Sequence, residues 1–372
     1  MSDPITRALD ALRRECIDEA GEGALADYIP ELSRADPSQF GIVLESHEGD
    51  AYAVGDATAP FTIQSISKPF VHALALEDLG LDAVYARVGA EPSGEPFNAI
   101  SLEPGTGRPA NPLVNAGAIL TTSLVRGGFE RIAAGLSAFA GRPLEVDEAV
   151  FASERRTGDR NRAIAHLMRG AGSLRGDVDE VLDTYFRQCA LIVTAADLAV
   201  MAATLANAGR DPVSGARVVG EETAQHVLSV MAMCGMYDSA GAWMLRVGLP
   251  AKSGVSGGVL AVSPGQFGIG LFSPPLDATG NSVRGVLACE RLAARFGLHL
   301  LHDATAGASA AKVLPDGDVL RLRGDIDFAA AELVLRLSRE HGGAPLVLDF
   351  SGVTRLHPVA QRLLEALPGH PA

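Results

Sequence analysis

The 372-residue sequence is poor in basic residues and in cysteine, and both shortages argue against whole classes of protein. It has 31 Lys and Arg against 45 Asp and Glu, which gives a formal net charge of −14. Nucleic-acid binding and docking on anionic lipid both depend on clustered basic side chains, so we expect neither partner. The cysteines show neither C-x-x-C nor Cys/His spacing, which argues against a zinc site or a redox pair. We therefore expect buried free thiols, no metal and no cofactor at Cys16, Cys189, Cys234 and Cys289.

Long apolar segments are also missing. The N-terminal twenty residues form a charged, amphipathic helical pattern without the apolar core of a signal peptide, which predicts a cytoplasmic protein. The most apolar stretch, residues 190–208, is interrupted by Asp197 and reads as a helix that Thr194 caps and Gly209 ends. Such a helix would be about 20 Å long, well short of a hydrocarbon core of roughly 30 Å. It is a buried helix of a globular domain, and no membrane partner is expected.

The order of elements predicts an α/β (α+β) fold for residues 1–300. One sheet is completed by both ends of the domain and is interrupted by a helical insertion. The predicted strands cover residues 41–44, 51–54, 243–247, 259–262 and 267–272. Predicted helices cover about 65–79, much of 115–233, and 283–296. A cleft between sheet and helices would bring distant residues together.

A second pattern follows a small-residue linker at 301–311. It reads as strand 319–323, helix 328–340, strand 346–350 and helix 359–367. Residues 312–372 therefore form a β-α-β-α unit, which is small for a free-standing domain.

The first candidate for chemistry is the segment QSISKPF, which runs from Gln64 to Phe70 at the start of a predicted helix. Ser65 and Lys68 are three residues apart, so on a helix they share one face. A serine nucleophile needs a base beside it, and lysine supplies one when burial lowers its pKa. A helix start also offers free backbone N–H groups to an oxyanion. Because S-x-x-K also occurs by chance in many helices, the motif needs a second signal.

That second signal is Lys252-Ser253-Gly254, just before the strand predicted at 259–262. A Lys-Ser/Thr-Gly strand beside an S-x-x-K helix is the pairing found in penicillin-recognising serine enzymes. The alternative is a glycine-rich turn that merely leads into a strand. The two motifs in this order indicate a serine-dependent hydrolase, with Lys252 as a further cation of the catalytic site.

Longer segments make the sequence resemble the bacterial-type, serine-dependent glutaminase family, which is similar in fold to serine β-lactamases and penicillin-binding proteins. The resemblance covers residues from about 25 to 300. It is carried by YIP from Tyr28, QSISK from Gln64, NPLVNAGAI from Asn111, SERRTGDRNRAIA from Ser153, YFRQC from Tyr185, CGMYDSAG from Cys234, PAKSGVSGG from Pro250 and GNSVRGV from Gly280.

The resemblance implies hydrolysis of L-glutamine to L-glutamate and ammonia through an acyl-enzyme. Ser65 would be the nucleophile and Lys68 its base, and Tyr185 or Tyr237 would relay a proton to the departing ammonia. The implied substrate contacts are Tyr28, Ser65, Asn115, Glu154, Asn161, Tyr185, Tyr237 and the backbone of Val255. The family also implies a homodimer or homotetramer.

The residue types suit this substrate, although each has a plainer alternative. Glu154 would pair with the α-ammonium group, or else face solvent within its charged run. Asn115 and Asn161 would bind the carboxylate, or else cap helices. Tyr185 and Tyr237 could be ordinary half-buried aromatic residues.

The C-terminal unit resembles a STAS domain through VLRLRGDIDF from Val319 and LVLDFSGVT from Leu346. In switchable members of that family a phosphorylatable hydroxyl residue follows the second segment. Here His357 and Pro358 stand in that region, so we expect no phosphate switch. The match is also incomplete, which favours an interaction or dimerisation module that could bind a protein partner.

Two other functions remain open at the level of sequence. The first is a β-lactamase-type hydrolase, which turnover of a chromogenic cephalosporin without turnover of glutamine would support. The second is a non-catalytic glutamine sensor that engages a partner through its tail. The Ser65, Lys68 and Lys252 set argues against a sensor, because a pure binder needs no activated nucleophile.

Overall fold

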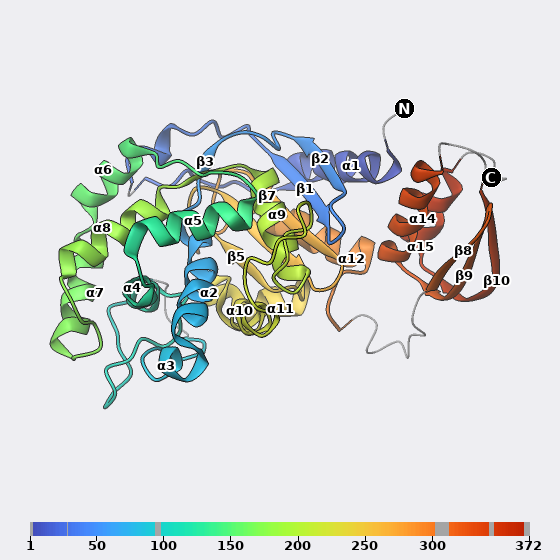
Figure 1. The fold of residues 1–372 in the computed structure, drawn as a ribbon. Helices are drawn as coiled ribbons and strands as arrows, with labels where there is room; N and C mark the ends of the chain where they lie inside the picture. The colour runs from blue at the N-terminus through green and yellow to red at the C-terminus, as the bar shows by residue number, and fades with distance from the viewer. Residues whose placement is uncertain (1–2, 28, 94–97, 302–311, 342–345, 368–372) are drawn as a thin grey trace.

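The computed structural model describes residues 3–27, 29–93, 98–301, 312–341 and 346–367. Figure 1 shows a central sheet between a group of helices at one end and a small C-terminal module at the other. The helices are α1 (Pro4–Glu19), α2 (Ser67–Leu79), α3 (Leu81–Tyr85), α4 (Asn115–Leu124), α5 (Gly128–Ala140), α6 (Glu148–Thr157), α7 (Asp159–Gly170), α8 (Val178–Cys189), α9 (Ala195–Ala206), α10 (Glu221–Cys234), α11 (Ala240–Arg246), α12 (Val283–Phe296), α14 (Phe328–Glu340) and α15 (Pro358–Glu365). The strands are β1 (Gly41–Ser46), β2 (Ala51–Gly55), β3 (Phe61–Thr62), β4 (Ile192–Val193), β5 (Ala251–Ser253), β6 (Gly258–Ser263), β7 (Phe267–Phe272), β8 (Lys312–Asp316), β9 (Val319–Ile326) and β10 (Val347–Leu356).

The central sheet has the strand order β2-β1-β7-β6-β5, and all of its neighbouring strands are antiparallel. Strands β1 and β2 precede the helical region, whereas β5, β6 and β7 follow it. The predicted sheet completed by both ends of the domain is therefore confirmed. Its central strand pair, β1 and β7, joins the two parts of the chain.

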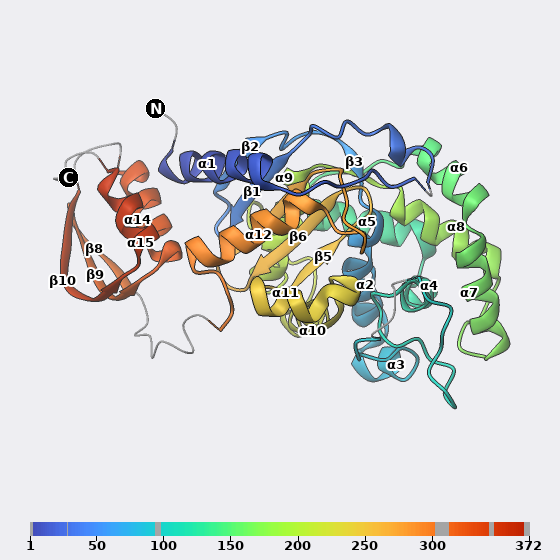
Figure 2. The same ribbon diagram turned by 180° about the vertical axis from the view of Figure 1, so that it is seen from behind.

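Helix α9 lies against one face of this sheet, and α1 and α12 lie against the other, as Figures 1 and 2 show from opposite sides. Two glycines of β7 allow the close approach of α9. A Cβ atom on Gly268 would lie 2.2 Å from the carbonyl oxygen of Ala199, and one on Gly270 would lie 2.0 Å from that of Ala195. The helix backbone occupies the space that side chains would otherwise fill.

The predicted N-cap of α9 is confirmed, but the helix ends earlier than predicted, at Ala206 with Asn207 as its C-cap rather than at Gly209. Thr194 accepts from the backbone of Asp197, whose carboxylate in turn accepts from the backbone of Thr194. In the described parts of the chain, no helix combines the length and apolar character needed to cross a membrane.

The strand predicted at 243–247 is wrong, because these residues belong mostly to helix α11. Trp243 is buried, and its indole N–H donates to the carbonyl of Leu249 at 2.7 Å. Two residues later, Leu245 is 80% exposed. A strand would place these two side chains on one face, so tertiary packing selected the helix from an ambiguous apolar run.

The C-terminal module forms a three-stranded sheet, order β10-β9-β8, with β9 parallel to β10 and antiparallel to β8. The four predicted elements of this unit are present as β9, α14, β10 and α15, and strand β8 was missed. Most of the predicted linker, residues 302–311, lies outside the described residues. Helices α14 and α15 lie between the module's sheet and the rest of the molecule (Figure 1).

The module shares its apolar core with the larger part of the chain. Phe328 packs against Phe267 of β7 and Phe296 of α12, with ring centroids 5.1 Å and 4.5 Å apart. Val359 and Leu363 of α15 belong to the same buried cluster. The module is therefore docked through an apolar contact surface.

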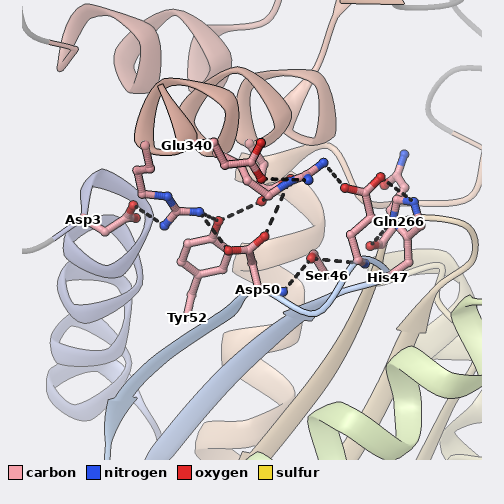
Figure 3. A network of polar contacts seen from close by, with 11 residues as sticks. Asp3, Ser46, His47, Asp50, Tyr52, Gln266 and Glu340 are labelled. Atoms are coloured by element: carbon pink, nitrogen blue, oxygen red, sulfur yellow. Dashed lines mark hydrogen bonds and ion pairs between the residues drawn. The ribbon is translucent and has the colours of Figure 1, made fainter. Parts of the chain in front are cut away.

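A polar network surrounds this contact (Figure 3). The Tyr52 hydroxyl donates to Glu332 Oε1 at 2.8 Å, and burial raises the pKa of the Glu332 carboxyl to about 7. Arg339 donates to Asp50 at 3.1 Å and to Asp3 at 3.2 Å. The network ties α14 to the β1–β2 hairpin and to the start of α1.

Candidate active site

The turn that carries Ser65 connects strand β3 to helix α2 through a short 3₁₀ segment, Gln64–Ile66. Gln64 has φ +50°, in the left-handed region that side chains other than glycine rarely adopt. This turn places Ser65 at the start of a continuous helical path, with its side chain 7% exposed. Non-glycine residues in this conformation cluster at functional sites, because the surrounding structure must hold them there.

Lys68 lies one helical turn later and is fully buried. Its Nζ donates to Asn115 Oδ1 at 2.7 Å and to the carbonyl of Leu113 at 3.3 Å. Burial lowers the pKa of Lys68 to about 8, although nearby groups such as Glu154 partly oppose the shift. A substantial neutral fraction is therefore present near neutral pH, as a base requires.

Asn115 connects Lys68 to Asn161. Its Nδ2 donates to Asn161 Oδ1 at 2.9 Å, while its Oδ1 accepts from Lys68. The capping alternatives for these residues are wrong, because α4 begins at Asn115 with Val114 as its N-cap and Asn161 lies within α7. Both asparagines contribute to the pocket wall.

Glu154 is buried rather than solvent-facing, since its side chain is 6% exposed. The side-chain amide of Gln64 donates to Glu154 Oε1 at 2.7 Å. Burial raises the pKa of Glu154 to about 7, and the Gln64 hydrogen bond and the Lys68 charge oppose that shift. A ligand cation beside this carboxyl would therefore favour its ionised form.

These side chains converge on a pocket of ≈ 240 Å³. The predicted site residues that line this pocket are Ser65, Asn115, Glu154, Asn161, Tyr185 and Val255. The remaining wall is formed by Ile29, Gln64, Asn98, Thr157, Gly158, Arg160, Phe186 and Cys189. Tyr28, also predicted to contact substrate, lies outside the described residues.

Of the predicted catalytic residues, Lys68, Tyr237 and Lys252 do not contribute to the lining of that pocket. The Tyr237 hydroxyl donates to the carbonyl of Ser253 at 2.9 Å, and burial raises its pKa, a shift that the Ser65 side chain partly opposes. Lys252 Nζ is 4.0 Å from the centroid of the Tyr237 ring and donates to Ser253 at 2.7 Å. Burial, and then the charge of Lys68, lower the pKa of Lys252 well below its usual value. Strand β5 also lies against the 3₁₀ segment that carries Ser65, so the two sequence motifs meet there.

Several residues of the pocket were not predicted from the sequence. Gln64 is the most important of these residues. Its position next to Ser65 in the QSISK segment was the one feature of the sequence that could have predicted its place in the site. Cys189 was predicted only as a buried thiol, and it is a free thiol in the pocket wall. Within the described residues, no group of three or more His, Cys, Asp and Glu side chains could hold a metal ion.

Fold and site together define a mixed α/β protein with a polar pocket for a small ligand, in which a serine at a helix start lies close to two buried lysines. Comparison with known proteins assigns the family. The family model described as Glutaminase matches residues 23–301, so the chain belongs to the glutaminase family.

Individual relatives agree with this assignment. Glutaminase 2 of Bradyrhizobium diazoefficiens is 50% identical over 92% of this chain, and the glutaminase of Trichormus variabilis is 53% identical over 75%. The match covers 60% of the first protein's own length and 85% of the second's. This chain thus spans less than two thirds of the length of its Bradyrhizobium relative.

Among solved structures, the chain is similar to Mglu in its native form, with 43% identity and a TM-score of 0.79. That match covers 98% of this chain and 95% of the other, so it extends into the C-terminal module. A structure described as the probable glutaminase ybaS has 40% identity and a TM-score of 0.76 over 80% of this chain and 99% of that one.

Proposed function

We propose that this chain hydrolyses L-glutamine to L-glutamate and ammonia through an acyl-enzyme on Ser65. The observation that carries the proposal is a pocket lined by Ser65, Asn115 and Glu154, with Lys68 hydrogen-bonded to Asn115, in a chain of the glutaminase family. A relative, Mglu, has also been described in a glutamate form, which supports an amino-acid ligand of this size.

In the first step, neutral Lys68 takes the proton of the Ser65 hydroxyl while Oγ attacks the side-chain carbonyl carbon of glutamine. The backbone N–H groups of Ser65 and Val255 stabilise the resulting oxyanion. The C–N bond then breaks, and a proton passes to the amine through Tyr237 or Tyr185 so that ammonia leaves. We favour Tyr237, because its hydroxyl is close enough to the Ser65 side chain for that side chain to affect its pKa.

In the second step, a water molecule attacks the acyl carbon with Lys68 as base. The bond to Ser65 Oγ breaks, the proton returns to that oxygen and glutamate is released. Lys252 packs against the Tyr237 ring and donates to the Ser253 carbonyl, and these contacts hold the ring in place. Every proton in this sequence comes from the chain, the substrate or water.

Recognition of the amino acid is divided between two sides of the pocket. The Glu154 carboxylate, oriented by Gln64, binds the α-ammonium group. Asn161 and Tyr185 donate to the α-carboxylate. The Asn115 amide is already engaged with Lys68 and Asn161, so it orders these two groups as well as facing the ligand.

Ammonia and glutamate release from L-glutamine tests the proposed activity. The purified chain should release both in equal amounts, and Ser65→Ala should release neither while it still binds glutamine. Binding by both proteins without turnover by either would favour the glutamine-sensor alternative.

The organisation around this site is proposed on the resemblance alone. Residues 1–300 would be the catalytic domain of a homodimer or homotetramer. Residues 312–372, joined by the linker 301–311, would be an incomplete STAS-like module that can engage a protein partner. Size-exclusion chromatography with light scattering measures the first, and pull-down with the full chain measures the second.

A further inference from the structure

A series of buried hydrogen bonds connects helices α4, α8 and α2 close to Ser65. Thr122 Oγ1 of α4 donates to Gln188 Oε1 of α8 at 2.9 Å. Gln188 Nε2 donates to Ser67 Oγ of α2 at 3.4 Å, and Ser67 Oγ donates to the backbone carbonyl of Gln64 at 2.8 Å. This series of hydrogen bonds therefore ends at Gln64, which precedes Ser65 and has the left-handed backbone conformation.

These contacts are withdrawn from solvent. Ser67 and Gln188 are fully buried, Thr122 is 2% exposed, and none of the three contributes to the pocket wall. A buried glutamine is costly unless its amide is hydrogen-bonded, and an apolar residue would fill the same space without that cost. Packing alone therefore does not account for a glutamine at this position.

The helices joined by these hydrogen bonds also carry the groups of the proposed reaction. Helix α2 carries Lys68, α4 carries Asn115, which accepts from Lys68 at 2.7 Å, and α8 carries Tyr185 in the pocket wall. Gln188 lies one turn after Tyr185 on α8. It thus connects the wall that holds the ligand to the turn that presents Ser65.

We propose that Gln188 is a positioning residue for the Ser65–Lys68 pair, an inference that rests on the proposed glutaminase reaction. It contacts neither substrate nor reacting atoms. Through Ser67 it restrains the Gln64 carbonyl, which keeps the strained turn closed and Ser65 aligned with Lys68. A small misplacement of the nucleophile slows the chemical step while the binding contacts at Glu154 and Asn161 persist.

Gln188→Leu tests the role without leaving its neighbours unpaired. Thr122 Oγ1 keeps the carbonyl of Ala118 at 2.8 Å as an acceptor, and Ser67 keeps that of Gln64. The variant should therefore fold, with a melting temperature close to wild type. We expect kcat for glutamine to fall by at least about tenfold while KM stays within about twofold.

A matched pair on α4 separates positioning from helix stability. Thr121 and Thr122 are both buried and both donate to the carbonyl of Ala118, but the hydrogen bond to Gln188 comes from Thr122. Thr122→Val should lower kcat about fivefold or more. Thr122→Ser, which keeps the hydroxyl, should have a kcat close to that of the wild type. Thr121→Val should leave kcat and KM near their wild-type values.

The outcomes are distinct from those that test the reaction itself. An inactive wild-type chain would remove the proposed function on which the inference depends. An active wild type with unchanged kcat in a folded Gln188→Leu variant would overturn the positioning role. The same follows if Thr121→Val and Thr122→Val lose activity equally, or if KM rises while kcat is preserved.

Discussion

At the scale of single residues, the site contains two buried ionisable groups whose pKa values are shifted in opposite directions. Burial lowers the pKa of Lys68 to about 8 and raises that of Glu154 to about 7. The lowered pKa of Lys68 makes its neutral form, the proposed base, more populated. The raised pKa of Glu154 means that its carboxyl becomes fully ionised only when a cation pairs with it. Opposed shifts of this kind in one pocket are typical of catalytic sites.

The first prediction concerns pH. Because kcat/KM reports the ionisation of the free enzyme, it should rise from pH 6 to pH 9 as Glu154 loses its proton near 7 and Lys68 near 8. Initial rates of ammonia release at fixed ionic strength measure this profile. In Glu154→Gln, which should bind glutamine more weakly, the Glu154 limb should disappear, and the Lys68 limb should remain but move to lower pH because the Glu154 charge raises the pKa of Lys68. A flat profile in the wild type would contradict both assignments.

The second prediction concerns binding. Glu154→Ala removes the carboxylate proposed to pair with the α-ammonium group, so glutamine affinity should fall by about tenfold or more. Calorimetry is best performed in a Ser65→Ala background, where no turnover consumes the ligand. Asp159→Ala is a suitable control, because this carboxylate is 91% exposed and lies on the neighbouring helix. Equal affinity for the Glu154 and Asp159 variants would show that Glu154 does not recognise the amine.

At the scale of elements, the close contact between β7 and α9 fixes the position of the helical region over the sheet. Gly268→Ala should therefore destabilise the fold by at least about 2 kcal/mol, because the new Cβ would overlap the backbone of Ala199 and Ala203. Chemical denaturation measures the effect. Gly241→Ala in α11 meets no atom within 4 Å and should be neutral or slightly stabilising. Similar stability of both variants would contradict the packing described here.

Sequence patterns predicted the elements whose signals are local. The alternation of β2, the N-terminal capping residues of α9 and the span of α14 are all readable from neighbouring residues. Helix α11 was predicted as a strand because its short apolar run fits both periods, and the choice rests on the contact between Trp243 and Leu249. Strand β5 is only three residues long and is flanked by Pro250 and Gly254, so no alternation could reveal it.

The site was predictable in its residues more than in its geometry. The motifs predicted Ser65 and Lys68 as site residues, because the spacing of the proposed nucleophile and its proposed base is local. The left-handed turn at Gln64 and the amide contacts of Asn115 and Gln188 depend on helices far apart in the sequence. Such contacts leave no pattern in one sequence, which is why Gln64 received no role.

At the scale of the whole molecule, the C-terminal module is docked by an interface that contains more carboxylates than arginines. Asp50 contacts both Arg336 and Arg339, and Glu332 is buried beside Tyr52. Arg336 also forms an ion pair with Glu48. Docking should therefore respond to the ionisation of Glu332.

The pKa of Glu332 is raised from 4.5 to about 7 in the folded chain. A raised carboxyl pKa means that the protonated form favours the folded state, so this contribution is complete below about pH 4.5 and is lost as pH rises through 7. Glu332→Gln should be more stable than the wild type by about 1–3 kcal/mol at pH 8 and equal to it near pH 4. Denaturant unfolding at the two pH values measures the difference. Glu340→Gln, on the exposed side of α14, should show no such dependence, and a pH-independent Glu332→Gln would contradict the assignment.

The central claim is that glutamine is hydrolysed through a covalent intermediate on Ser65. Rapid quenching in acid during turnover, followed by peptide mass spectrometry, tests it most directly. An acyl-enzyme mechanism predicts a glutamyl group on the peptide that contains Ser65, absent in Ser65→Ala and lost when hydroxylamine captures it as the hydroxamate. Rapid ammonia release without an adduct and without hydroxamate formation would contradict the account, because water would then attack glutamine directly.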